Sequence, residues 1–262
     1  MEKNRVLILF FSILLFVSCT DKAKEDNPEE DLKAKEMFQG LWVTEEDDVP
    51  ALMAKGDSIF YPDSASMSVK FWIYQDSLFL KGQNKNSYKI TKQSDNIFVF
   101  LNNNGEEVKL VKSKNKDLKA SFGYQVYAMN TFLHDEADTT VRTSFGYFDS
   151  NIKVKTTSDR VIKSTFNENG MEVDNTYLDN VASVNITNHG TKIFAHDFKK
   201  QEFASLIDRK FLEKSILRRF EFNRADEMAL YYDAIIGIPD ASTSYVIEIR
   251  ITNDGKTSMK MS

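Results

Sequence analysis

The chain has few of the residues that supply covalent cross-links and metal ligands: one cysteine, three histidines and four prolines among 262 residues. The single cysteine is Cys19, so no intramolecular disulfide can form. The histidines, His134, His189 and His196, lack the i, i+2 or i, i+4 spacing with which one strand or helix presents a transition-metal pair. We therefore predict no metal site and a fold stabilised by packing and sheet hydrogen bonds.

Motifs of catalysis and cofactor binding are also missing. The sequence has no Gly-X-Ser-X-Gly elbow, P-loop or Gly-X-Gly-X-X-Gly. Two acidic runs, residues 45–48 and 135–138, lack the alternating spacing and central glycine of a calcium loop, so we interpret them as solvated loops. We predict no catalytic residue, no cofactor and no enzyme. The alternative is a hydrolase using scattered carboxylates, whose separation in space a sequence does not show.

The chain is mildly acidic, with a net charge of −5. A nucleic-acid-binding protein usually carries a basic patch or stripe, so we predict no nucleic-acid partner. Aromatic residues are plentiful, with 20 Phe and 10 Tyr against 10 Gly, which favours strands over low-complexity structure.

The N-terminus has the pattern of an export signal. Residues 1–5 include two basic side chains, and residues 6–17 form an apolar run shorter than the ~20 residues that span a bilayer. The segment Leu15-Phe16-Val17-Ser18-Cys19 resembles the lipobox of bacterial lipoproteins. That resemblance implies cleavage before Cys19, attachment of diacylglycerol to its thiol, and acylation of its amine with a fatty acid such as palmitate. The alternative is an uncleaved N-terminal anchor helix; either way we expect attachment to a membrane.

The hydrophobic pattern divides the remainder into regions. Alternating residues such as Val69, Phe71 and Ile73, and the Asn104-Gly105 turn, indicate antiparallel strands in the first half. Further strand patterns follow, and Phe203, Leu206, Ile207 and Phe211 recur at helical spacing, which predicts an amphipathic helix over 199–214. The predicted organisation is a signal peptide (1–18), a lipidated cysteine with an acidic flexible tether (19–37), an antiparallel β meander (38–112), a linker (113–118) and an α+β domain (119–262).

Two resemblances add to this scheme. Gly40-Leu41-Trp42 ahead of a meander is similar to the start of lipocalins, in which the tryptophan closes the base of a barrel with a ligand cavity. Residues 56–63, followed by an aromatic hairpin over 70–80, resemble uncharacterised lipoproteins of Bacteroides-type bacteria. The first implies a mainly β fold with a lipocalin-like meander or small barrel. The second implies an outer-membrane-anchored lipoprotein on the periplasmic or cell-surface face.

One strand face is the candidate binding site. If Val69, Phe71 and Ile73 face the core, Lys70, Trp72 and Tyr74 face outward, where aromatic rings beside polar groups suit a glycan, an apolar ligand or an envelope protein partner. The alternative is that the second domain covers these rings. The leading hypothesis is a non-catalytic binding or assembly module.

Ser64 is a candidate site of O-glycosylation. It lies in Asp63-Ser64-Ala65, which fits the short pattern glycosylated in the periplasm of Bacteroides-type bacteria.

Overall fold

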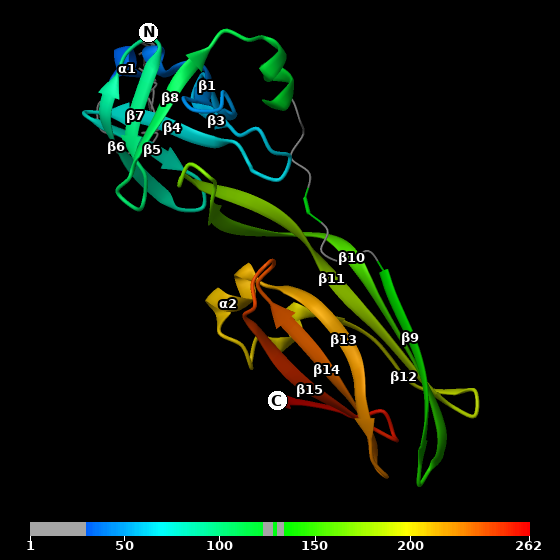
Figure 1. Cartoon of the computed structure of the whole chain (residues 1–262). Helices are drawn as coiled ribbons and strands as arrows, with labels where there is room; N and C mark the ends of the chain where they lie inside the picture. Colours follow the sequence, from blue (N-terminus) through cyan, green and yellow to red (C-terminus); the bar gives the residue numbers. More distant parts are fainter. Residues whose placement is uncertain (1–29, 123–127, 130–133) are drawn as a thin grey trace, which may run out of the picture.

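A computed structural model describes residues 30–122, 128–129 and 134–262 (Figure 1). Cys19, the predicted signal peptide and most of the predicted tether lie outside these residues, as does most of a strand pattern over 122–129. The molecule is elongated, with a barrel at the end where the described chain begins and two packed sheets at the other (Figure 1).

The N-terminal half is a closed antiparallel barrel of eight strands in chain order. Its last strand pairs with its first over four residue pairs, from Leu41↔Ser113 to Thr44↔Leu110. The predicted mainly β, lipocalin-like fold is therefore confirmed. The strands are β1 (Gly40–Thr44), β2 (Pro50–Lys55), β3 (Ser58–Phe60), β4 (Val69–Tyr74), β5 (Ser77–Lys81), β6 (Lys85–Gln93), β7 (Ile97–Leu101) and β8 (Glu107–Ser113).

A short helix, α1 (Leu32–Phe38), closes one end of the barrel. Asp31 caps it by accepting a hydrogen bond from the Ala34 amide at 2.9 Å. The indole Nε1 of Trp42 donates to the Phe38 carbonyl oxygen at 2.7 Å, and the Phe38 ring lies 4.3 Å from that of Phe98. Ala34, which lies within the predicted tether (19–37), is thus buried in the barrel core.

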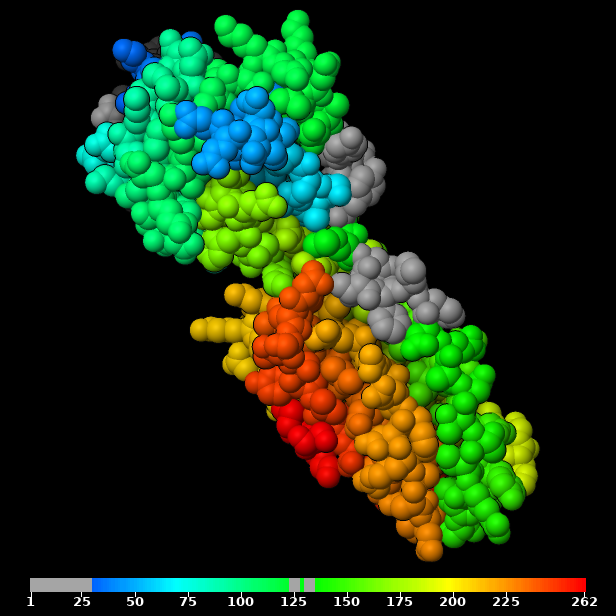
Figure 2. Space-filling view, viewed as in Figure 1, coloured from blue at the N-terminus to red at the C-terminus, as the bar shows by residue number. Residues whose placement is uncertain are grey.

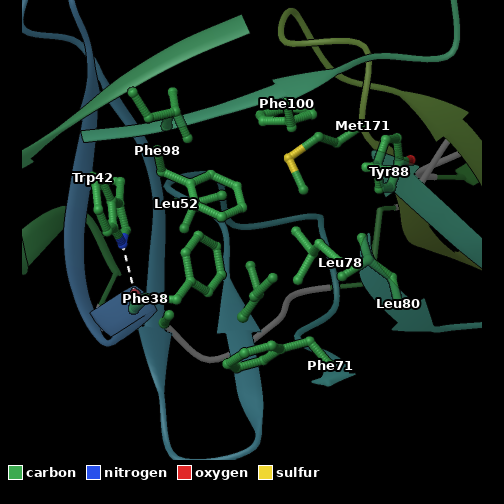
Figure 3. Packing of buried hydrophobic residues seen from close by; sticks show 14 of the residues in the cluster. Phe38, Trp42, Leu52, Phe71, Leu78, Leu80, Tyr88, Phe98, Phe100 and Met171 are labelled. Carbon is green, nitrogen blue, oxygen red and sulfur yellow. Dashed lines mark hydrogen bonds between the residues drawn. The ribbon is translucent and has the colours of Figure 1, made fainter. Parts of the chain in front are cut away.

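Side chains fill the barrel interior (Figure 3). Phe38, Trp42, Leu52, Phe98 and Phe100 are all completely buried in one cluster. Large side chains thus occupy the space in which the lipocalin resemblance implied a ligand cavity.

The C-terminal half consists of two four-stranded antiparallel sheets that share one core. The Phe198 and Phe220 rings, one from each sheet, stack with centroids 5.0 Å apart, and the hydroxyls of Ser150 and Tyr232 lie 2.7 Å apart across the same seam. We call this half the sandwich. One sheet has β9 (His134–Thr143), β10 (Gly146–Phe166), β11 (Glu172–Asn188) and β12 (Thr191–Lys199); the other has β13 (Ile216–Ala225), β14 (Ala229–Gly237), β15 (Ser244–Thr252) and β16 (Thr257–Met261).

The long β10–β11 hairpin belongs to both halves of the molecule. Its tip lies against the barrel (Figure 2), and Met171 and Val173 join the barrel core. The Met67 amide donates to the Asp174 carbonyl oxygen at 2.8 Å, and the Gln83 amide donates to the Asp174 carboxylate at 2.7 Å. The hairpin tip therefore packs against the barrel core, although the sequence prediction placed its residues in the α+β domain.

The helix predicted over 199–214 is shorter than expected. Its residues form a 3₁₀ turn, η2 (Lys200–Phe203), and a separate helix, α2 (Arg209–Lys214), because Asp208 starts a new helix by accepting from the Lys210 and Phe211 amides. The apolar spacing still holds in part: Phe203 and Ile207 are buried, while Leu206 and Phe211 are half-buried against the same core. A 3₁₀ helix, Asp117–Phe122, follows the barrel.

Candidate binding site on the barrel rim

A depression of about 530 Å³ lies on the rim of the barrel, where α1, β4 and β5 come together. We call it the rim pocket. It brings together Lys70 and Trp72 of the predicted binding face, while Tyr74 lies at the far end of β4, half-buried beside Gln75. The lining residues are Glu30, Lys35, Asp57, Ser68, Lys70, Phe71, Trp72, Lys81 and Gly82.

Strand alternation positions the pocket residues of β4. Val69, Phe71 and Ile73 belong to the barrel core, which leaves Lys70 and Trp72 on the outer face. Trp72 pairs with Phe79 on β5, and the two rings stack with centroids 5.2 Å apart and planes 5° from parallel. The Lys85 ammonium lies 5.1 Å from the Trp72 ring centroid. The contacts that cover this tryptophan thus come from the barrel's own strands.

The edge of the Trp72 ring is the unusual feature of the rim pocket. The residue is only 8% exposed, and its indole Nε1 is buried without a hydrogen-bond partner among the described residues. A buried donor without an acceptor is costly, and an indole N–H can only donate. By contrast, the indole of Trp42 donates to the Phe38 carbonyl oxygen.

One lysine holds both carboxylates that line the pocket. The Lys35 ammonium lies 2.7 Å from a carboxylate oxygen of Glu30 and 2.6 Å from one of Asp57. Desolvation lowers the pKa of Lys35, but its hydrogen bonds to Asp57 and Glu30 outweigh that effect and raise it. The hydrogen bond and charge of Lys35 lower the pKa of Asp57.

Three further lysines occupy neighbouring positions on successive strands. The register pairs Lys70 on β4 with Lys81 on β5, and Lys81 with Lys85 on β6. Like charges directly opposite one another destabilise a sheet. We call these three residues the lysine ladder. The sequence analysis did not predict it. The short turn at Gln75-Asp76 was nevertheless a signal, because a two-residue turn pairs residue 74 with residue 77 and therefore residue 70 with residue 81.

The remaining predicted sites lie apart from this pocket. Ser64 is exposed in the loop before β4, where the Asp63 carboxylate accepts hydrogen bonds from the Ala65 and Ser66 amides. His196 meets Glu202 at 2.7 Å, and His189 occupies a turn with φ 47°. Within the described part of the chain, no three His, Cys, Asp or Glu residues are grouped to hold a metal ion.

The structure confirms the predicted solvated loop for one of the two acidic runs and contradicts it for the other. Residues 45–48 form the exposed β1–β2 turn, as predicted, with Glu45 paired to Lys109. Residues 135–138 are exposed but lie in β9 and not in a loop, with Glu136 2.7 Å from Lys153 of the neighbouring strand. The prediction of a loop was wrong here, because cross-strand pairing with β10 holds the run extended.

The far end of the sandwich carries a second depression of different character. It is about 470 Å³ and lies among the β9–β10, β13–β14 and β15–β16 turns. Phe145 and Met228 line it and are 58% and 55% exposed. The Ser144 hydroxyl and the Asn253 side-chain amide both donate to the Glu227 carbonyl oxygen, which ties these turns together. We call this end of the molecule the sandwich tip. It exposes two large apolar side chains, whereas the rim pocket is lined mainly by charged side chains.

None of the helices in the described residues is long and apolar enough to cross a membrane. Fold and site together define a two-part β protein, with a filled lipocalin-like barrel joined to a sandwich through a shared hairpin.

Residues 123–259, slightly more than half of the chain, match the family described as "Domain of unknown function (DUF4738)". The chain belongs to this family, and the match spans the sandwich and excludes the barrel strands. It matches no curated protein.

Proposed function

We propose that this protein is a membrane-anchored lipoprotein of the outer membrane, on its periplasmic or surface face. In this proposal it acts as a non-catalytic binding or assembly module, and it binds through the outside of its barrel.

The filled barrel interior is the observation that supports binding on the outside of the barrel. A lipocalin-type carrier encloses its ligand, but here Phe38, Trp42 and Phe98 occupy the interior, α1 closes one end, and Met171 enters from the hairpin. An interior packed in this way offers a ligand no volume without unfolding part of the core. Recognition is therefore assigned to the rim pocket.

The carboxylates of the rim pocket support binding over hydrolysis. A general acid of a glycosidase needs a raised pKa, and its partner carboxylate faces it across the substrate. Glu30 and Asp57 instead share one ammonium, and the pKa of Asp57 is lowered. This arrangement suits a fixed ion pair that shapes the pocket wall.

The proposed anchor would attach at the barrel end. Ten residues separate Cys19 from Glu30, a length that reaches at most about 35 Å. The described chain begins at the barrel, opposite the apolar tip of the sandwich (Figure 1). In the proposed orientation the barrel lies near the lipid surface and the sandwich projects away from it.

Metabolic labelling with an alkyne fatty acid tests the anchor. The wild-type chain should be labelled and recovered with membranes, whereas Cys19→Ala should be unlabelled, because the chain has no other thiol. Thr20→Ala, which keeps the cysteine, is the matched control. Label that persists in Cys19→Ala would rule out the proposed lipidation site.

A titration with an apolar fluorescent probe tests the binding mode. In Trp72→Phe, tryptophan emission comes from Trp42 in the barrel core alone, because the chain has two tryptophans. We expect no saturable quenching of this emission by the fatty-acid probe parinaric acid. Saturable quenching of the Trp42 emission would show an internal ligand site and contradict an outer one.

A further inference from the structure

We propose that the rim pocket recognises an oxyanion, a carboxylate or phosphate group carried by a sugar or a lipid headgroup, through the Trp72 indole N–H and Lys70. This inference rests on the proposed function and names the ligand class of the same site.

The indole N–H requires an acceptor. Trp72 is nine-tenths buried, lines the pocket, and has no hydrogen-bond partner for Nε1 among the described residues. Because this group only donates, a cation or a pure hydrocarbon would leave it unsatisfied. A negatively charged oxygen makes a shorter and stronger hydrogen bond to such a donor than a neutral oxygen does.

The lysines favour a negative charge at the same place. Lys70 lines the pocket and forms no salt bridge among the described residues. Both carboxylates already contact Lys35. An oxyanion in the pocket would give Lys70 a partner of opposite charge.

The covering of Trp72 excludes recognition by ring stacking. Neutral sugars are often bound on an exposed aromatic face, but the Trp72 ring stacks against Phe79 and has the Lys85 ammonium 5.1 Å from its centroid. Only its polar edge lacks a partner among the described residues. A pocket of about 530 Å³ accommodates a molecule of monosaccharide size, so the group recognised is an oxyanion on a small polar ligand.

Calorimetric titration of the purified full-length protein in detergent tests this inference. The probes are galacturonate, which carries a sugar carboxylate, glycerol 3-phosphate, which carries a headgroup phosphate, and methyl glucoside, which is neutral. Trp72→Phe replaces the indole by a phenyl ring, so it keeps an aromatic side chain and removes the N–H; it should weaken oxyanion binding about tenfold, the effect of one hydrogen bond to a charged group. Lys70→Gln removes one exposed charge and should weaken it about threefold.

Lys89→Gln is the matched control. Lys89 is exposed on β6, one of the strands that carry the ladder, but pairs with Ser77 and does not line the pocket. It should bind the probes as the wild type does, and unchanged melting temperatures would show that all variants fold.

The two charged probes distinguish the sources of the oxyanion. Tighter binding of galacturonate indicates an acidic glycan, and tighter binding of glycerol 3-phosphate indicates a lipid headgroup. Absence of binding, equal binding of methyl glucoside, or equal affinities in Trp72→Phe, Lys70→Gln and the wild type would overturn the inference. The labelling and probe experiments above would be unaffected, so failure here is distinguishable from failure of the proposed function.

Discussion

The barrel closes through the pairing of β1 with β8, whereas each sheet of the sandwich ends in two edge strands. Closure satisfies the barrel's backbone hydrogen bonds within one ring of strands. The barrel then also needs side chains that fill its interior. The helix α1, which precedes the barrel strands in sequence, and the tip of the β10–β11 hairpin, which follows them, both contribute side chains to the barrel core. The sandwich is held face to face by side chains, so its stability depends on what crosses the seam between the sheets.

Polar groups as well as rings cross that seam. Asp179 on β11 accepts hydrogen bonds from the Leu217 and Asn180 amides and lies 3.4 Å from the Lys200 ammonium, which also donates to the Ser215 carbonyl oxygen. Asp179 and Lys200 are both buried. The comparison predicts that loss of volume damages the barrel most and loss of a polar partner damages the sandwich most.

The largest effect is expected from removing the Phe38 side chain from the barrel core. Phe38→Ala should lower the free energy of unfolding by about 4 kcal/mol, because it deletes a fully buried aromatic ring from a closed interior. Leu32→Ala on the same helix is the control: Leu32 is 70% exposed, and the change should stay within about 0.5 kcal/mol. Urea unfolding followed by tryptophan emission, which reports on the barrel because both tryptophans lie in it, measures both. Equal small losses would mean that α1 does not fill the barrel.

A comparable loss of unfolding free energy should follow in the sandwich when one buried charge, that of Asp179, is removed. Asp179→Ala leaves Lys200 buried without its carboxylate and should cost about 3 kcal/mol. The double variant Asp179→Ala/Lys200→Met should recover part of that loss, since no buried charge then remains unpaired. Urea unfolding of the wild type, Asp179→Ala, Lys200→Met and the double variant gives the coupling energy. A double variant as unstable as the sum of the single variants would show that the pair does not interact.

The alternation and turns of the barrel made it predictable, because both are local properties of the sequence. Asn104-Gly105 is a tight turn with φ +79° at the glycine, and Val69, Phe71 and Ile73 face the core as their spacing predicted. Sequence alternation also placed Lys70 and Trp72 outward. The short β4–β5 turn could have revealed the pairing of Lys70 with Lys81, but the burial of the Trp72 indole depends on packing by Phe79 and Lys85.

The sandwich was harder to predict because its elements depend on distant partners. Strand β10 runs through residues 146–166, but the polar stretch before Arg160 interrupts the alternation, and the register with β11 shifts between Thr156 and Arg160. The helical spacing around Leu206 was real over a few residues only, since the 3₁₀ turn η2 ends at Phe203 and Asp208 caps a separate helix, α2. The entry of Met171 into the barrel has no local signal, because its neighbours there are more than 60 residues away in sequence.

A smaller effect should follow at the joint between the two halves. Met171→Ala removes a buried side chain that the hairpin contributes to the barrel, and should cost about 2 kcal/mol. Met228→Ala, at the exposed tip of the sandwich, should cost less than about 0.5 kcal/mol. If barrel and sandwich unfold together, tryptophan emission from the barrel and far-ultraviolet circular dichroism from the whole chain will show the same shifted midpoint. Separate midpoints would show that the hairpin does not couple the halves.

The smallest effect concerns the ion pair at the barrel rim and depends on pH. The hydrogen bond from Lys35 lowers the folded-state pKa of Asp57 below its usual value of 3.8. Hydrogen bonds to Asp57 and Glu30 raise that of Lys35 above 10.5, against the opposing effect of desolvation. A lowered carboxyl pKa stabilises the fold above the unfolded value, and this contribution is lost as the pH falls through the folded value. A raised lysine pKa stabilises the fold below its unfolded value and is lost as the pH rises through the folded one.

The advantage of the wild type over Asp57→Asn should therefore be constant between about pH 5 and pH 9, and it should be lost as the pH falls below 3.8 and through the lower folded-state pKa of Asp57. Because the Asp57 side chain is 78% exposed, solvent screening limits the plateau to roughly 0.2–1 kcal/mol. Urea unfolding of both proteins across this range measures it, and added salt should reduce the difference because it screens exposed charges. A difference that persists unchanged at low pH would show that Asp57 stabilises the barrel through packing and not through its charge.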